Sequence, residues 1–204
     1  MNKILKTNLK IKSSLKKSDS LFLCLIEKYG DIEIIVAKDS YEFLLSSIIG
    51  QQLSGKVADV IWKRFAGFYG GVISPELVLN SGNDDLRNLG ISYSKINYLK
   101  NVSEFVISGE INLNKFDTLS DEEIIGKLTA VKGIGNWTAQ MFLIFALGRE
   151  DVFSVGDGGL QRAVKMLYKM DEIPSKQELI QISSKWSPYK SYASLYLWKS
   201  LENS

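Results

Sequence analysis

The sequence of 204 residues contains no histidine and a single cysteine, Cys24. Without histidine there is no Ser-His-Asp triad, no imidazole acid–base catalysis and no histidine-ligated metal. One cysteine excludes a disulfide framework, a CxxC zinc site and a four-cysteine iron–sulfur cluster. Any catalysis must therefore rest on carboxylates, lysine, tyrosine, hydroxyl groups or the one thiol. We expect Cys24, which lies among apolar residues, to be buried and inert.

Long hydrophobic runs are also absent. No apolar stretch approaches the roughly 20 residues that a membrane-spanning helix needs. The N-terminal segment has lysines but no apolar stretch followed by a small-residue cleavage site, so we expect no secretory signal. Hydrophobic residues make up 45% and charged residues 24% of the chain, which is typical of a globular protein. A chain of this length supports one domain, or two small lobes that share a core.

The chain has little excess of either charge, since its formal net charge is +2. The distribution is less even, because residues 1–17 carry six lysines and no acidic residue. Such a basic arm either makes salt-sensitive contacts to phosphates or is a solvated N-terminus, and the sequence leaves both interpretations open.

Helix-start signals recur along the chain. Some pairs of residues three apart have the form of a capping box, and some serines precede a proline suited to the first helical position. These signals are Asp39 with Glu42, Ser120 with Glu123, Ser175 with Glu178, Ser74-Pro75 and Ser187-Pro188.

Between these starts, apolar residues recur near the helical period of 3.6. One such stripe, which predicts a core-facing side, consists of Val57, Val60, Ile61 and Phe65. Only residues 32–36 have strand-like character. The sequence therefore predicts an all-α fold of about nine to eleven helices.

Residues 120–147 predict a helical hairpin. A capped helix leads into the turn Val131-Lys-Gly-Ile-Gly135, and an apolar helix follows from about Asn136. Two glycines separated by one residue permit a tight turn and a close approach of the backbone to a ligand. The first amides of the second helix, with Lys132 in the same turn, would suit a phosphate. The alternative is an ordinary packing corner between two helices.

The turn with its flanks, residues 131–139, resembles the helix-hairpin-helix of the HhH-GPD superfamily of DNA glycosylases. Three further segments are similar to motifs of this superfamily, in the same order along about 150 residues. They are Ile48-Ile-Gly-Gln-Gln-Leu-Ser54, Asp151–Leu160 and Trp186–Trp198. The last segment resembles the C-terminal signature of the 3-methyladenine DNA glycosylase II branch. The ordered set is more specific than the hairpin alone.

The resemblance implies a two-lobed helical fold, with residues 1–204 as a single domain and an active-site cleft between the lobes. It implies the compact all-helical form, because the chain lacks the N-terminal α+β domain of larger bacterial members. The implied function is a monofunctional DNA glycosylase that flips out and excises alkylated purines of the 3-methyladenine type in base excision repair. Its partner would be damaged double-stranded DNA and not a membrane. It would be a monomer in the prokaryotic cytoplasm or the eukaryotic nucleus.

Two alternatives remain at this point. One is a glycosylase of the same fold that acts on another damaged base, such as hypoxanthine or an oxidised base. The other is a non-catalytic DNA-binding helix-hairpin-helix protein. The missing cysteines disfavour the adenine-mismatch branch. Asp157 disfavours the binding module, which has no need of a carboxylate in a glycine-flanked loop.

By resemblance, Asp157 is the catalytic aspartate. Breaking an N-glycosidic bond builds positive charge on the sugar, and a fixed anion stabilises that charge. Whether Asp157 also acts as a base toward water does not follow from the sequence. A helix N-cap is the common alternative use of aspartate, and it is compatible with catalysis because a capped carboxylate is held in place. We interpret Asp151, six residues earlier, as structural.

Three side chains are candidates for the base pocket. Trp137 occupies the position at which lyase-active relatives carry a Schiff-base lysine; it cannot form an imine, so water would be the nucleophile. The face of Trp137 would stack on a flipped cationic base with a favourable free energy of about 0.5–2 kcal/mol. The alternative is that Trp137 is a tryptophan of the hydrophobic core. Tyr189 is a candidate by position, and Met141 stands where relatives can have an aromatic. Gly158 also replaces an aromatic, which predicts a roomier pocket.

The resemblance also assigns contacts to DNA. Gln52, with Leu53 beside it, would fill the gap left by a flipped nucleotide, although the alternative is a surface turn capped by Ser54. The phosphate site of the hairpin would consist of Lys132, Gly133, Gly135 and Trp137. No cofactor is implied. The family often binds a monovalent cation, here Na⁺ or K⁺, whose carbonyl ligands would be those of Thr129, Val131 and Gly133.

Overall fold

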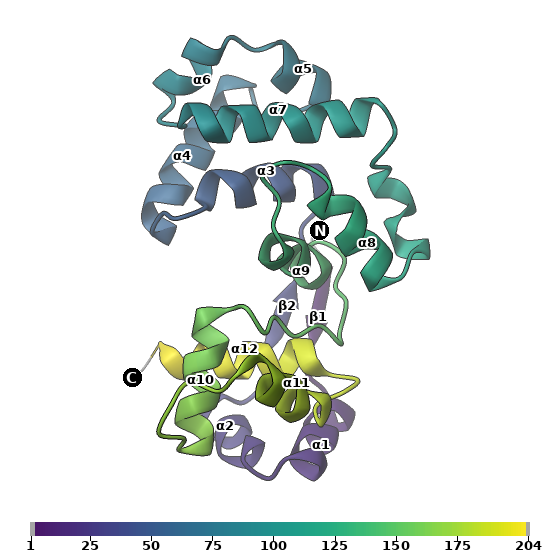
Figure 1. Cartoon of the computed structure of the whole chain (residues 1–204), viewed down its shortest axis with the longest axis vertical. Helices are drawn as coiled ribbons and strands as arrows, with labels where there is room; N and C mark the ends of the chain where they lie inside the picture. The colour runs from purple at the N-terminus through teal and green to yellow at the C-terminus, as the bar shows by residue number, and fades with distance from the viewer. Residues whose placement is uncertain (1–2, 203–204) are drawn as a thin grey trace. The chain divides into compact units, whose positions relative to one another are not determined.

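The computed structural model describes residues 3–202, and the chain forms two compact units (Figure 1). Unit 1 comprises Met1–Lys38 and Leu143–Ser204, and unit 2 comprises Asp39–Phe142. The described residues form twelve α-helices, one 3₁₀ helix and one two-stranded sheet. The all-α prediction is confirmed. The helix number exceeds the predicted nine to eleven, because helices of six residues are too short to show a helical period.

Unit 2 is built around its longest helix, α7. Its elements are α3 (Ser40–Gly50), α4 (Gly55–Phe68), α5 (Pro75–Asn80), α6 (Asn83–Asn88), α7 (Tyr93–Ile107), the 3₁₀ helix η1 (Leu113–Thr118), α8 (Asp121–Thr129) and most of α9 (Asn136–Phe145). Helix α7 packs against α3 on one side and against α5 and α6 on the other (Figure 1). The fully buried residues Ile96 and Leu99 supply part of its contact with the core.

Unit 1 combines the two ends of the chain. Its elements are β1 (Ile4–Lys6), α1 (Leu9–Ser18), α2 (Phe22–Tyr29), β2 (Glu33–Ile35), α10 (Gly158–Tyr168), α11 (Lys176–Ser184) and α12 (Lys190–Leu201). Helix α12 packs against α2 and α10. The core is aromatic: the ring of Phe22 lies edge-on to Trp186 at 5.2 Å and to Tyr196 at 6.4 Å.

The two short strands pair in antiparallel fashion, with Leu5 opposite Ile34. The strand-like character of residues 32–36 is thus confirmed by β2. Its partner β1 is too short, at three residues, to show an alternating pattern in the sequence.

Most predicted helix starts are confirmed. Ser120 and Ser175 each form a complete capping box, and Asp39 and Ser74 each cap their helix with a side-chain oxygen. Local hydrogen bonds therefore define where these helices begin.

The helix start predicted at Ser187-Pro188 is wrong. This peptide bond is cis, and α12 begins only at Lys190. The carboxylate that receives the first amide of α12 belongs to Asp151, whose Oδ1 lies 3.3 Å from the Lys190 nitrogen. Asp151 Oδ2 also accepts a hydrogen bond from the Ser187 hydroxyl at 2.7 Å. These contacts agree with a structural role for Asp151, and a residue so far away in sequence leaves no local signal of capping.

Two burial predictions are also wrong. Val57 and Val60 are about half exposed, although Ile61 and Phe65 of the same stripe are buried, because only one side of α4 packs on α3. Cys24 is exposed, since the buried side of α2 is formed by its neighbours in the helix. In the part of the chain that the structure describes, no helix has both the length and the apolar character to span a bilayer.

Candidate active site and nucleic-acid interface

The carboxylate of Asp157 is held at the start of α10. Its Oδ1 accepts a hydrogen bond from the Leu160 amide at 2.7 Å, which makes Asp157 the N-cap of the helix. The same oxygen accepts a second hydrogen bond from the indole Nε1 of Trp198 on α12, at 3.0 Å. Asp157 is only 9% exposed. Donors from two helices thus fix an anion in a buried position, which is the arrangement required to stabilise developing positive charge.

Gly159 makes this arrangement possible. A Cβ atom at this position would lie 3.0 Å from Asp157 Oδ1 and 3.3 Å from Trp198 Cδ1. A side chain here would therefore require the carboxylate or the indole to shift by a few tenths of an ångström. The close packing of these two groups therefore favours glycine at position 159.

Trp198 is a functional candidate that the sequence analysis did not single out. It lies 41 residues from Asp157 in the sequence. Its ring is also tilted against Phe145, with 6.1 Å between ring centroids. Its presence in the C-terminal motif is the only signal that pointed to it, and nothing in the sequence pairs it with Asp157.

Tyr189, the second pocket candidate, lies in unit 1 as Asp157 does. It is 8% exposed and lies edge-on to Tyr192, at 6.3 Å between ring centroids. The structure places it in the packed region at the start of α12. Its assignment to the base pocket remains a prediction.

The predicted hairpin is present in unit 2. Helix α8 ends at Thr129 and α9 begins at Asn136. Gly133 has a φ of +108°, which non-glycine residues rarely adopt, and Ile134 is buried. Lys132 and Gly135 are exposed, so the turn presents a lysine and the first amides of α9 to solvent. This geometry suits an anion.

Trp137 lies in the first turn of α9 and is 46% exposed. This exposure argues against a purely structural core tryptophan. Met141 follows one turn later on the same side of the helix, but it is 6% exposed. Of the two α9 candidates for the base pocket, only Trp137 offers a large open surface.

The turn between α3 and α4 carries Gln52 and Leu53, the residues predicted to fill the gap left by a flipped nucleotide. We call this segment the wedge turn and Gln52 the wedge. Gln52 has a φ of +58°, which is uncommon for a residue with a side chain, and it is exposed. Leu53 beside it is also exposed. The strained backbone at the tip of an exposed turn is typical of a functional position.

Comparison with known proteins decides the family. Residues 45–188 match the model of the HhH-GPD superfamily base excision DNA repair proteins. The chain belongs to this superfamily.

Three relatives illustrate the similarity. The chain is 35% identical over 185 residues to the Bacillus subtilis protein YfjP, which is named as a candidate DNA-3-methyladenine glycosylase; the match covers 87% of this chain and 64% of that protein, slightly under two thirds of its length. A DNA-3-methyladenine glycosidase from Bacillus halodurans has a similar crystal structure, with TM-score 0.87, 39% identity and coverage of 97% and 92%. The Schizosaccharomyces pombe 3-methyladenine DNA glycosylase Mag1, solved with abasic DNA, has TM-score 0.86, 33% identity and coverage of 95% and 97%.

In this HhH-GPD chain, the wedge turn and the hairpin are directly connected. The Gln51 side chain donates a hydrogen bond from Nε2 to the Gly133 carbonyl oxygen at 2.9 Å. The Lys95 ammonium of α7 donates to the carbonyl oxygens of Ile49 and Gln51, both at 2.8 Å. Partial burial lowers the pKa of Lys95 by desolvation. Gln51 stands in the predicted Ile48–Ser54 motif without an assigned role, and no sequence signal pointed to Lys95.

The proposed cation ligands can be compared with the hydrogen bonds of the hairpin. The Val131 carbonyl accepts a hydrogen bond from the Ile134 amide at 3.0 Å, and the Gly133 carbonyl accepts one from Gln51. A carbonyl oxygen has two lone pairs, so each retains acceptor capacity. Hydrogen bonding therefore leaves the Val131 and Gly133 carbonyls able to accept a further contact. Among residues 3–202, no cluster of three or more Cys, Asp or Glu side chains could hold a metal ion.

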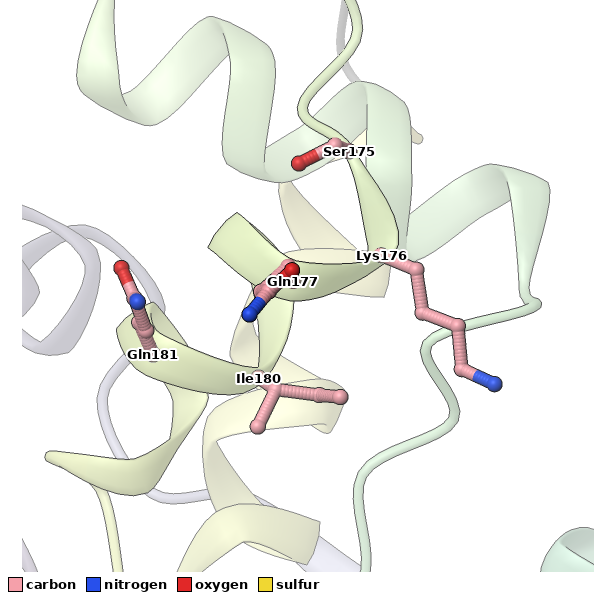
Figure 2. A pocket seen from close by; sticks show the side chains of 5 residues that line it. All are labelled: Ser175, Lys176, Gln177, Ile180 and Gln181. Carbon is pink, nitrogen blue, oxygen red and sulfur yellow. The ribbon is translucent and has the colours of Figure 1, made fainter.

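Figure 2 shows a pocket on the surface of α11, lined by Ser175, Lys176, Gln177, Ile180 and Gln181. Ser175 is the N-cap of α11, and the other four residues lie within this helix. None belongs to the sites described above, so this pocket adds nothing to the candidate active site.

Proposed function

We propose that the chain is a monofunctional DNA glycosylase that hydrolyses the N-glycosidic bond of alkylated purines, chiefly of the 3-methyladenine type, in double-stranded DNA. The observation that carries this proposal is the buried Asp157 carboxylate, held by the Leu160 amide and the Trp198 indole. One relative is named as a DNA-3-methyladenine glycosylase and another as a DNA-3-methyladenine glycosidase, and these names support the choice of base.

In the proposed reaction, the bond between the sugar C1′ and the purine nitrogen breaks, and its electron pair leaves with the base. A purine methylated at N3 or N7 already carries a positive charge, so it departs as a neutral molecule. Positive charge builds on the sugar, where the Asp157 carboxylate stabilises it. Water then bonds to C1′ and releases a proton, and the products are the free base and an abasic site.

The choice among damaged bases can be tested with single-lesion duplexes that contain 3-methyladenine, 7-methylguanine, hypoxanthine or 8-oxoguanine. We expect the first two to be excised at least about tenfold faster, because a cationic base is both a better leaving group and a partner for Trp137. Faster excision of hypoxanthine or 8-oxoguanine would indicate the same fold with another base preference. Binding without excision of any lesion would indicate a non-catalytic DNA-binding protein.

A monofunctional enzyme should form no covalent complex with its substrate. Position 137 is tryptophan, which has no amine to form an imine at C1′. Incubation with a lesion-containing duplex and borohydride should therefore trap no protein–DNA adduct, as judged by denaturing electrophoresis. A lyase-active glycosylase run in parallel serves as the positive control. An adduct in good yield would contradict the monofunctional assignment.

Trp198→Phe should lower single-turnover excision by about tenfold to hundredfold, because a hydrogen bond to a charged group contributes about 1.5–3 kcal/mol. The phenyl ring keeps most of the packing against Phe145 but cannot donate to Asp157. Trp62→Phe is the matched control, since Trp62 stacks on Phe65 in unit 2. Equal rates for the two variants would show that the indole donor does not contribute to catalysis.

Substitutions in the wedge turn and in the hairpin should affect different properties, namely excision and binding to any duplex. Gln52→Ala should reduce excision more than binding to undamaged duplex, because a wedge acts only after the base leaves the stack. Lys132→Glu should weaken binding to every duplex and flatten the slope of log affinity against log salt by about 0.9 for each phosphate that the protein no longer neutralises. Filter binding over a salt series measures both effects. Equal lesion-specific defects with an unchanged slope would mean that neither residue contacts DNA as proposed.

A monovalent cation at the hairpin would be held by the carbonyls of Thr129, Val131 and Gly133. When bound, Na⁺ or K⁺ would supply positive charge beside a DNA phosphate. We expect tighter duplex binding in potassium chloride than in tetramethylammonium chloride of equal ionic strength, since the larger cation does not fit between backbone carbonyls. Equal affinities in the two salts would contradict a cation at this position.

We also propose that both units act together as one monomeric glycosylase domain. Asp157 lies in unit 1, whereas Trp137, Gln52 and the hairpin turn lie in unit 2, so neither unit carries all the proposed machinery. The protein would work where chromosomal DNA lies, in the cytoplasm of a prokaryote or the nucleus of a eukaryote.

A further inference from the structure

Helix α7 presents three side chains at intervals of three residues, and each of them contacts one of the two turns proposed to read DNA. Lys95 donates to the carbonyl oxygens of Ile49 and Gln51 in the wedge turn. The Tyr98 ring lies so close to Gly133 that a Cβ there would be 2.3 Å from Tyr98 Cγ. Asn101 Nδ2 donates to the Lys132 carbonyl oxygen at 3.3 Å. Because residues three apart share one side of a helix, these contacts form a row along α7.

The wedge turn needs such support. Its tip, Gln52, has a positive φ, a conformation that costs free energy and persists only when its surroundings impose it. The last carbonyls of α3 have no partner within the helix and lie at its negative end. The Lys95 ammonium satisfies one of them, Ile49, together with the Gln51 carbonyl just before the tip. It therefore fixes the backbone on the N-terminal side of Gln52.

Gln51 adds a direct link between the turns. Its carbonyl oxygen is held by Lys95, and its side chain donates to the Gly133 carbonyl at 2.9 Å. A displacement of the hairpin is thereby transmitted to the residue that precedes the wedge. This hydrogen bond therefore joins the two turns directly, in addition to the contacts that both make with α7.

We propose that Lys95 and Gln51 are positioning residues that lock the wedge turn and the hairpin turn into one element, so that Gln52 enters the duplex in fixed register with the phosphate held at the hairpin. The proposal rests on the proposed function, because it concerns the use of these turns on DNA. Neither residue needs to touch the reacting atoms. Their removal should impair insertion of the wedge and leave the contacts to an undamaged duplex in place.

The test compares Lys95→Met with Lys100→Met. Lys100 lies on the same helix and also donates to a backbone carbonyl, but that carbonyl belongs to Ser81, which lies in neither turn, at 2.8 Å. Wedge insertion is read from the fluorescence of 2-aminopurine placed beside an abasic-site analogue, which rises when the stack opens. Excision is measured in single turnover on a methylated duplex and on the same methylated single strand, where no gap in a duplex has to be filled.

For Lys95→Met we expect the fluorescence rise to be lost and duplex excision to fall by about tenfold to hundredfold, a typical effect of a small misplacement. Affinity for undamaged duplex and excision from the single strand should stay within about twofold of wild type. Lys95→Arg, which retains charge and donors, should recover most of the signal. Lys100→Met should behave as wild type in all four measurements. Gln51→Ala provides the second variant, with the same expected pattern, if Lys95→Met does not fold.

The proposal is overturned if Lys95→Met and Gln51→Ala match Lys100→Met in fluorescence and duplex excision. It is also overturned if excision falls equally on duplex and single strand along with a lower melting temperature, since that pattern indicates a structural role alone. Failure of the proposed function is recognised separately. In that case the wild-type protein excises no methylated base, while the fluorescence on the abasic duplex still reports whether the wedge inserts.

Discussion

Replacing Asp157 with asparagine should lower single-turnover excision of a methylated purine by about 100- to 1000-fold, while the protein stays folded and binds duplex DNA. The amide has the shape of the carboxylate, and its oxygen can still accept the hydrogen bonds from Leu160 and Trp198. It lacks the negative charge that stabilises the developing positive charge on the sugar. Excision rates at saturating enzyme, together with the affinity for an abasic-site duplex, measure the two properties separately.

Asp151→Asn is the matched control for this substitution. Asp151 contacts Ser187 and the start of α12, and no role in the reaction is assigned to it. We expect this variant to lose some stability but to retain excision within a few-fold of wild type. Comparable excision by Asp157→Asn and wild type, or a larger loss in Asp151→Asn, would remove Asp157 from the catalytic role.

The second large effect is expected at Gly133. An alanine there would adopt an unfavourable φ of +108°, and its Cβ would lie 2.3 Å from Cγ of the Tyr98 ring. The hairpin and α7 cannot both keep their positions. We expect Gly133→Ala to lower the free energy of unfolding by roughly 2–4 kcal/mol and to weaken binding to all duplexes. Denaturant unfolding and filter binding measure these changes.

Gly126→Ala provides a control within the same hairpin. Gly126 lies inside α8, and a Cβ there would meet nothing within 4 Å. This substitution should raise the stability by about 0.5–1 kcal/mol, because alanine is the better helix former. If both variants have the stability of the wild-type protein, the close packing of Gly133 on Tyr98 is wrong.

Much of the fold can be predicted because its signals are local. The capping boxes at Ser120 and Ser175 place a hydroxyl and a carboxylate three residues apart, and the structure contains both. Gly133 can be predicted in the same way, since its place in the turn requires a residue that tolerates a positive φ. The same locality explains how Asp157 could be predicted as a helix N-cap before its tertiary contacts were known.

Features that depend on distant residues could not be predicted. The indole of Trp198 donates a hydrogen bond to Asp157, which is 41 residues away in the sequence. Lys95 donates to Gln51, which is 44 residues away. Neither pair has a spacing that identifies it. The error at Ser187-Pro188 has the same origin, because Asp151, 39 residues before Lys190, supplies the cap that the local pattern assigned to serine. Cys24 lies among apolar residues, but which of them face the core is set by packing and not by composition.

The central claim, hydrolytic release of an alkylated purine by one protein without strand cleavage, is tested most directly by a single-turnover reaction on a duplex with one 3-methyladenine. The released base is quantified by chromatography, and strand breaks are counted before and after alkali. We predict one free base for every alkali-induced break and no breaks before alkali, with both products formed about 100- to 1000-fold more slowly by Asp157→Asn. Release of no base by the wild-type protein, or breaks that appear without alkali, would contradict the account.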